Sequence, residues 1–192
     1  MRKLHGTYAK IVTCSAAALL LTACATAPTT PANYTGFDAA YTDTTDYGSR
    51  LPNHMNTGGK KLVYVDPNSH AWGAYGADGN LVKAGIATAG ASVCPPDAQD
   101  ESDCRTGRGS FHITSLGNGD CYSKKYPRPT GGGLMPYCMF FNNGQALHGS
   151  PDNIVVNDNL SHGCVRMRIP DAEWMRYNFA QVGTKVVVEP YN

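Results

Sequence analysis

The segment KKLVYVDPNSHAWGAYGADGNLVKAGI, residues 60–86, contains three short β-strand patterns separated by two turn signals. Residues 60–65 alternate and are rich in β-branched side chains, and residues 71–75 and 81–86 are further strand candidates. The intervening sequences DPNS and ADGN are typical of tight turns. The segment therefore predicts three consecutive antiparallel strands.

Further β patterns follow this segment toward the C-terminus. They occupy residues 109–114, 137–141, 145–148, 154–156 and 185–189. One helix is predicted from residue 170 or 171 to residue 179, with apolar side chains at helical spacing and Gly183 positioned to end it. These apolar residues are Ala172, Met175, Phe179 and Val182. We therefore predict a mainly β fold, a β-sandwich-like arrangement of mixed sheets with one or two short helices.

The composition is consistent with one ordinary domain plus appendages. The chain has 192 residues, of which 42% are hydrophobic, 21 are Gly and 12 are Pro, and this balance favours turn-rich β structure over a helical bundle. The 16 Lys and Arg residues are balanced by 15 Asp and Glu residues. Because this charge provides no broad positive field, we expect no nucleic-acid partner.

The N-terminus has the pattern of a secretory signal. Three basic residues precede a short apolar run at residues 11–21. The run ends in the sequence LTAC, with Cys24 last, which resembles the bacterial lipobox in which the cysteine is acylated after cleavage. We therefore expect a lipoprotein signal peptide at residues 1–23 and a lipid anchor on Cys24. The alternative is a soluble secreted protein, cut nearby by the ordinary signal peptidase, in which Cys24 has no role.

Residues 24–59 have the composition of a lipid-anchored flexible tether, with many Thr, Ala, Pro, Asn and Asp residues and no apolar periodicity. Cleavage before Cys24 would remove three of the 16 basic residues and no acidic one, leaving 13 against 15 and a slightly acidic mature protein. Ala25, not Asp, follows the cysteine. We therefore expect an exported protein that, in a Gram-negative cell, is anchored to the outer membrane and faces the periplasm.

Residues 146–167 contain the candidate catalytic residues. His148 follows a strand pattern, and Cys164 follows Gly163 after a polar return loop. The thiolate form of cysteine is the reactive nucleophile. A thiol with an ordinary pKa of ~8.5 needs a base or a cation beside it to form the thiolate at neutral pH. The backbone N–H groups around Gly163 and Cys164 are candidates to face an acyl oxyanion. The pattern therefore predicts a cysteine nucleophile paired with a histidine base.

These residues resemble the signature of the L,D-transpeptidase (YkuD-type) family: His, a spacer, then Ser or Thr-His-Gly-Cys, with Asn or Arg two positions later. Here twelve residues separate His148 from the sequence SHGC at residues 161–164, and Arg166 occupies the last position. The similarity extends over roughly residues 60–190. It implies that residues 60–192 form an L,D-transpeptidase catalytic domain with the fold of that family.

The resemblance also implies the roles of individual residues. Cys164 matches the nucleophile and His148 the proton donor and acceptor, the Gly149 carbonyl would orient His148, and Gly163 would contribute to the oxyanion site. The positions that match substrate-binding residues are Gly144, Ser161, His162 and Arg166. The resemblance implies no cofactor and no metal, and we expect a monomer whose partners are peptidoglycan stem peptides and, through the N-terminal lipid, a membrane.

The reaction implied is acyl transfer on a tetrapeptide stem of peptidoglycan. An acyl-enzyme would form at the diamino acid with release of D-Ala, and the acyl group would pass to an amine of another stem. The alternatives are an L,D-carboxypeptidase, with water as acceptor, and a non-catalytic wall-binding lipoprotein on the same fold. A zinc enzyme that uses His148, His162 and Cys164 is a further alternative.

The seven cysteines divide by role in this interpretation. The signal peptide contains Cys14, and after Cys24 and Cys164 are assigned four remain in an exported chain, where disulfides are expected. These four are Cys94, Cys104, Cys121 and Cys138. Three pairings are possible, and we favour Cys94 with Cys104 and Cys121 with Cys138, since each closes a short loop. We expect the acidic residues 97–103 and the basic residues 124–125 to lie in solvated loops.

Overall fold

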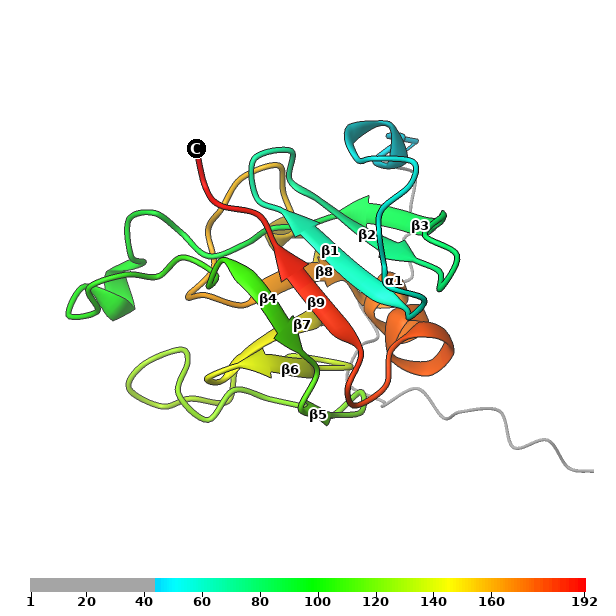
Figure 1. Ribbon diagram of the computed structural model, residues 1–192. Coiled ribbons are helices and arrows are strands. Elements are labelled where there is room, and N and C mark those ends of the chain that lie inside the picture. The colour runs from blue at the N-terminus through cyan, green and yellow to red at the C-terminus, as the bar shows by residue number, and fades with distance from the viewer. Residues whose placement is uncertain (1–43) are drawn as a thin grey trace, which may run out of the picture.

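The computed structural model describes residues 44–192, which form two mixed β-sheets with short helical segments (Figure 1). The predicted signal peptide at residues 1–23, the predicted anchor Cys24 and most of the predicted tether lie outside the described residues. No helix within residues 44–192 has the length and apolar character needed to cross a bilayer.

The first sheet has five strands in the order β3-β2-β1-β9-β4. These are β1 Leu62–Asp66, β2 Ala71–Tyr75, β3 Leu81–Ile86, β4 Gly109–His112 and β9 Lys185–Val188. The three strands β1, β2 and β3 are consecutive and antiparallel, which confirms the prediction from residues 60–86. The last strand, β9, inserts between β1 and β4 and runs parallel to β1.

The second sheet has four strands in the order β5-β6-β7-β8. These are β5 Ser115–Leu116, β6 Met139–Asn142, β7 Gln145–Ser150 and β8 Val165–Arg168. β6 and β7 are joined by Asn143 and Gly144, both with positive φ (42° and 88°), as the two-residue turn of a tight hairpin requires. β7 and β8 are parallel, so the chain must cross over between them.

The main core lies between the two sheets. Val63 and Val65 of β1 face it from the first sheet, and Met139, Leu147 and Val165 face it from the second. Because side chains alternate along a strand, Leu62 and Tyr64 are directed to the opposite face of the first sheet, where they join a second cluster. Both faces of the first sheet are therefore covered.

The second cluster includes residues that precede β1. Tyr47 and Leu51, which flank the 3-10 helix η1 Gly48–Arg50, are only 5% and 7% exposed and pack in this cluster. The expectation of a flexible tether up to residue 59 is therefore wrong for residues 47–51. The reason is that two apolar side chains in this stretch cover the outer face of the sheet.

The predicted helix is present and starts at α1 Ile169–Trp174, directly after β8. It continues as the π-helical turn η4 Met175–Phe179, and Ala172, Met175 and Phe179 enter the main core. Val182 is 60% exposed, so its assignment to the apolar face was wrong; the helix has already ended. The fold is mainly β with mixed sheets and a short helix, as expected.

The remaining differences concern short segments. Residues 154–156 do not form the predicted strand, since the 3-10 turn η3 Asp152–Ile154 lies there. The strands β5 and β8 were not predicted. β8 matters most, because it begins directly after Cys164 and sets that residue beside β7.

Candidate active site

The parallel pair β7 and β8 brings the predicted histidine and cysteine to one face of the second sheet. Leu147 pairs with Val165, and both side chains enter the core between the sheets. The residues on either side of this pair are directed the other way, because side chains alternate along a strand. His148 therefore shares the opposite face with Cys164 and Arg166. The arrangement places a base, a thiol and a cation together.

His148 is buried and held by its own strand. Its Nδ1 lies 2.8 Å from the Gly149 carbonyl oxygen, and Ser150 Oγ is 3.4 Å from the same nitrogen. With Nδ1–H donating to the carbonyl oxygen, Nε2 keeps its lone pair for a proton. Burial lowers the pKa of His148 to about 4; the Gly149 hydrogen bond opposes this shift and the Arg166 charge adds to it. The imidazole is neutral at pH 7.

Cys164 is a free, partly buried thiol at the end of the polar return loop. Burial raises its pKa, while a hydrogen bond from the Ala146 backbone and the positive charge of Arg166 favour the thiolate. The Sγ atom lies 4.0 Å from the Gly144 carbonyl oxygen, at the tip of the β6–β7 hairpin. The resting pair is thus a neutral thiol and a neutral imidazole, which suits removal of the thiol proton by a base.

The turn before Cys164 is fixed by buried hydroxyl groups. Ser161 Oγ donates to the Cys164 carbonyl oxygen over 2.5 Å and accepts the Gly163 N–H over 3.1 Å. Thr106 Oγ1 donates to the Gly163 carbonyl oxygen over 2.9 Å and accepts the N–H of Gly90. The Gly163 N–H thus bonds to Ser161 Oγ in this structure, and its expected role at an oxyanion stays a prediction. The next amide, that of Cys164, is a further candidate donor.

Gln145 lies beside this turn and holds the residues on either side of Thr106. Its Oε1 accepts the Gly107 N–H, its Nε2 donates to the Arg105 carbonyl oxygen, and both distances are within 3.0 Å. Gly163 has a φ of 118°, and a β-carbon there would lie 2.8 Å from Gln145 Nε2, so no other residue fits. Sequence reasoning missed Thr106 and Gln145, because nothing in their local sequence links them to a turn 18 or more residues away.

A cavity of about 940 Å³ opens beside Cys164. Gly144 and His162, two of the four predicted substrate-binding residues, line it together with Cys164 and Gln145. Within residues 44–192, Ser161 and Arg166 are not part of its lining. Ser161 holds the turn before Cys164, and Arg166 lies on the same face of the sheet as Cys164 and favours its thiolate; contact of these two residues with substrate stays a prediction.

Two disulfides close loops beside the cavity. They are Cys94–Cys104 and Cys121–Cys138, the pairings favoured from the sequence. We call residues 94–104 the first disulfide loop and residues 121–138 the second disulfide loop. Figure 1 shows both in green, projecting on the same side of the molecule.

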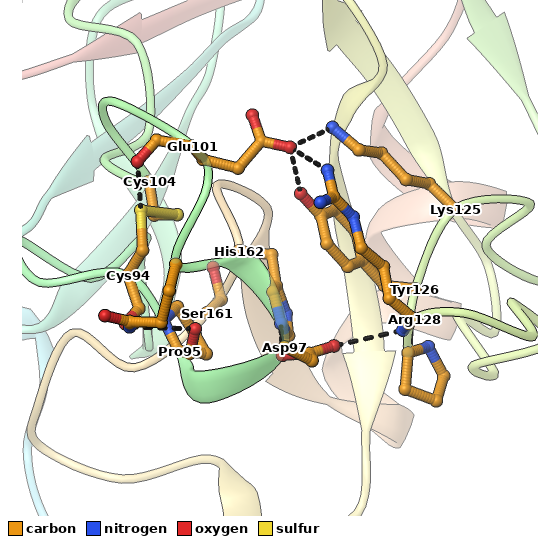
Figure 2. A network of polar contacts seen from close by, with 12 residues as sticks. Cys94, Pro95, Asp97, Glu101, Cys104, Lys125, Tyr126, Arg128, Ser161 and His162 are labelled. Atoms are coloured by element: carbon orange, nitrogen blue, oxygen red, sulfur yellow. Dashed lines mark hydrogen bonds and ion pairs between the residues drawn. A yellow bond between two sulfur atoms is a disulfide. The ribbon is translucent and has the colours of Figure 1, made fainter.

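Charged side chains join the two disulfide loops (Figure 2). Glu101 accepts from Lys125 Nζ at 2.5 Å, from the Tyr126 hydroxyl at 3.2 Å, and from Arg128. Arg128 also pairs with Asp100. Both charged stretches lie in loops with mostly exposed side chains, as expected, and the acidic stretch also provides the counter-ions of the basic one.

His162 lies where these loops meet the cavity. Its Nε2 is 2.6 Å from Asp97 Oδ1, and its ring stacks on Tyr126 with centroids 4.1 Å apart. The Nε2 atom of His162 is therefore engaged by Asp97. In the described part of the chain, no three His, Cys, Asp or Glu side chains converge as a metal site requires, so the zinc alternative lacks its ligand set.

The family model of the YkuD L,D-transpeptidase catalytic domain matches residues 60–188. The chain belongs to this family. No curated protein sequence matches the chain. The family match begins two residues before β1 and ends with β9, so it covers both sheets and the His148 and Cys164 pair.

Solved structures with a similar fold include three L,D-transpeptidases. The one from Xylanimonas cellulosilytica is 22% identical with a TM-score of 0.61, over 73% of this chain and 66% of that chain. One from Mycobacterium smegmatis is 21% identical with a TM-score of 0.54, over 68% and 59%. One from Mycobacterium tuberculosis is 19% identical with a TM-score of 0.54, over 68% and 58%. The chain thus spans less than two thirds of each structure, and the likeness establishes the fold.

Proposed function

We propose that the protein is a cysteine-dependent L,D-transpeptidase that acts on tetrapeptide stems of peptidoglycan. The observation that carries this proposal is the placement of Cys164 and His148 on one face of β7 and β8, with Cys164 open to a cavity. Membership of the L,D-transpeptidase family supports the substrate class. The cavity, at about 940 Å³, is large enough for a short peptide.

In the first half-reaction, Cys164 Sγ attacks the carbonyl carbon of the diamino acid while the thiol proton passes to His148 Nε2. The carbonyl oxygen becomes an oxyanion, for which the Cys164 backbone N–H is a candidate donor. The tetrahedral intermediate then collapses: the bond to the D-Ala nitrogen breaks, and His148 returns the proton to that nitrogen. D-Ala leaves and a thioester remains on Cys164.

In the second half-reaction, the amine of another stem attacks the thioester carbonyl and loses a proton to His148. The bond between carbon and Sγ breaks, and the proton returns to the sulfur. Because the thiol and the imidazole begin and end neutral, the reacting pair itself carries no buried charge in the resting enzyme. Arg166 stabilises the negative charge that passes through Sγ, since it lies on the same face of the sheet.

The proposal includes export of the protein and a lipid anchor on Cys24 that holds it at the outer membrane facing the periplasm. Its support is the pattern of a positive start, a short apolar run and LTAC in residues 1–24. Labelling of the cells with a radioactive fatty acid tests the anchor, because replacement of Cys24 by Ala should abolish the label on this protein.

The reaction is tested by incubating the purified domain with disaccharide-tetrapeptide and analysing products by mass spectrometry. We expect released D-Ala and a dimer cross-linked between two diamino acids in the wild type, and neither product in Cys164→Ala. Released D-Ala with only a tripeptide product would favour the L,D-carboxypeptidase alternative. No product from the wild type would favour the wall-binding alternative and overturn the proposal.

A further inference from the structure

The wall of the cavity opposite the sheet is built by residues that neither the motif nor the reaction explains. Glu101, Lys125 and Tyr126 line the cavity with His162, and the first three come from the two disulfide loops. In Figure 2 the His162 and Tyr126 rings lie between Asp97 below and Glu101 above. The wall is therefore held from both ends by carboxylates of the first disulfide loop.

Asp97 holds two elements at once. Its Oδ1 lies 2.6 Å from His162 Nε2, and its Oδ2 accepts the Arg128 backbone N–H over 3.1 Å. These hydrogen bonds, with that from His162 first, lower the pKa of Asp97, so the carboxylate is charged at neutral pH. One side chain thus ties the loop before Cys164 to the second disulfide loop.

Glu101 holds Tyr126, the other ring of the stack. Its carboxylate accepts hydrogen bonds from the Tyr126 hydroxyl at 3.2 Å and from Lys125 Nζ at 2.5 Å, and it pairs with the Arg128 guanidinium. The side chains of Glu101 and Arg128 are only 28% and 26% exposed. Several donors on one partly buried carboxylate form a network, which holds geometry better than an isolated surface pair.

These contacts end on His162 and Tyr126 and do not reach the reacting atoms. His148 and Cys164 have other partners, namely the carbonyls of Gly149 and Gly144. A loss of the carboxylates would therefore change the cavity wall and leave the proton transfer pathway in place. Variants of the two carboxylates should therefore change the binding of the peptide substrate and leave the rate of the chemical step largely unchanged.

We propose that Asp97 and Glu101 are positioning residues: they hold His162 and Tyr126 as a stacked wall of the cavity and so set the affinity for the peptide donor. The inference rests on the proposed function for the identity of the donor. It gives the first disulfide loop a role in substrate specificity. The aromatic and imidazole faces form the platform against which the peptide backbone packs, and the disulfide Cys94–Cys104 anchors the loop that holds it.

The test measures binding apart from turnover. Calorimetry with disaccharide-tetrapeptide compares Cys164→Ala with the same protein carrying Asp97→Ala, Glu101→Ala or Asp97→Asn. We expect Kd to rise about tenfold for the two Ala variants, the scale of one lost hydrogen bond to a charged group. Asp97→Asn should restore part of the affinity, because it keeps one acceptor oxygen. Asp158→Ala, an exposed carboxylate outside the network, serves as the matched control.

Two further readouts separate positioning from a merely structural role. In an otherwise wild-type protein, Asp97→Ala should raise KM with kcat changed less than about twofold. The imidazole nitrogen resonances of His162 should shift in Asp97→Ala and stay unchanged in Asp158→Ala. Three results would overturn the proposal: equal Kd values with and without Asp97, no detectable binding of the peptide to the Cys164→Ala parent, or an unchanged His162 spectrum in Asp97→Ala. If Kd rises as expected and the wild type still releases no D-Ala, the proposed function fails and the positioning role stands.

Discussion

His148 and Arg166 are register partners in the parallel pairing of β7 and β8. A permanent cation therefore lies on the same face of the sheet as the base, and it acts on both reacting groups. It lowers the pKa of His148 and favours the thiolate of Cys164. Burial is the main reason that the pKa of His148 is low, and the cation adds to this effect while it favours negative charge on Cys164.

Alkylation of Cys164 tests the role of this cation. Because the pKa of Cys164 is raised, the rate with iodoacetamide should stay low near pH 7 and climb with pH beyond 9. Arg166→Gln removes a favourable charge and should lower the rate at pH 8 by about tenfold, which equals one pKa unit. Arg166→Lys keeps the charge and is the matched control. A rate already constant between pH 6 and 8 would instead indicate a preformed thiolate.

The buried His148 makes the fold sensitive to acid. Its pKa is about 4 in the folded protein and ~6.5 in an unfolded chain, so the unfolded state binds more protons below pH 6.5. Folding stability therefore falls as the pH drops from 6.5 to 4, by about 3 kcal/mol from this group. Urea unfolding at pH 7 and pH 4 should show this loss in the wild type and a smaller loss in His148→Gln. Equal losses in the two proteins would contradict the assigned pKa.

Thr106 should act through the turn that carries Cys164. Thr106→Val keeps the shape and removes the hydroxyl that bonds to Gly163 and Gly90, leaving buried polar groups unpaired. We expect a loss of about 1–3 kcal/mol in the free energy of unfolding. Thermal and urea denaturation measure it, with Thr106→Ser as the control that retains the hydroxyl. A fully stable Thr106→Val would show that the turn is held by other contacts.

The segment that precedes β1 should contribute to stability, contrary to its sequence-based interpretation as a tether. Leu51→Ala removes a buried side chain from the outer cluster and should cost about 2–3 kcal/mol. Leu160→Ala provides the comparison, since Leu160 is 47% exposed and should change stability little. Both values come from urea unfolding. If the two variants are equally stable, residues 47–51 do not pack as described.

The local elements of the fold could be predicted from the sequence, and its non-local pairings could not. Alternation within residues 60–86 was enough for β1 to β3, because neighbouring strands and tight turns leave a local signal. The insertion of β9 beside β1 joins residues more than 120 positions apart, as in the pair Leu62 and Lys185, and no local pattern encodes it. The 3-10 turn at η3 was mistaken for a strand because its short apolar run is ambiguous.

The candidate site shows the same difference between residues in a local motif and contacts that depend on the fold. His148 and Cys164 could be proposed from the sequence because the chemistry of a thiol and an imidazole stands out within one short motif. Asp97 and Thr106 reach the site from the loops before β4, and their contacts with His162 and Gly163 depend on the fold. A run of acidic residues has the same sequence whether solvent or basic side chains neutralise it, which is why the network at Glu101 was missed.

The central claim, that Cys164 carries the acyl group with His148 as its base, is tested most directly by intact-mass analysis during a single turnover. Wild-type protein, mixed with excess tetrapeptide donor and quenched in acid, should gain the mass of the donor less D-Ala, and peptide mapping should locate the adduct on Cys164. His148→Gln should form the adduct far more slowly. Release of D-Ala with no adduct, or an adduct on any other residue, would contradict the account.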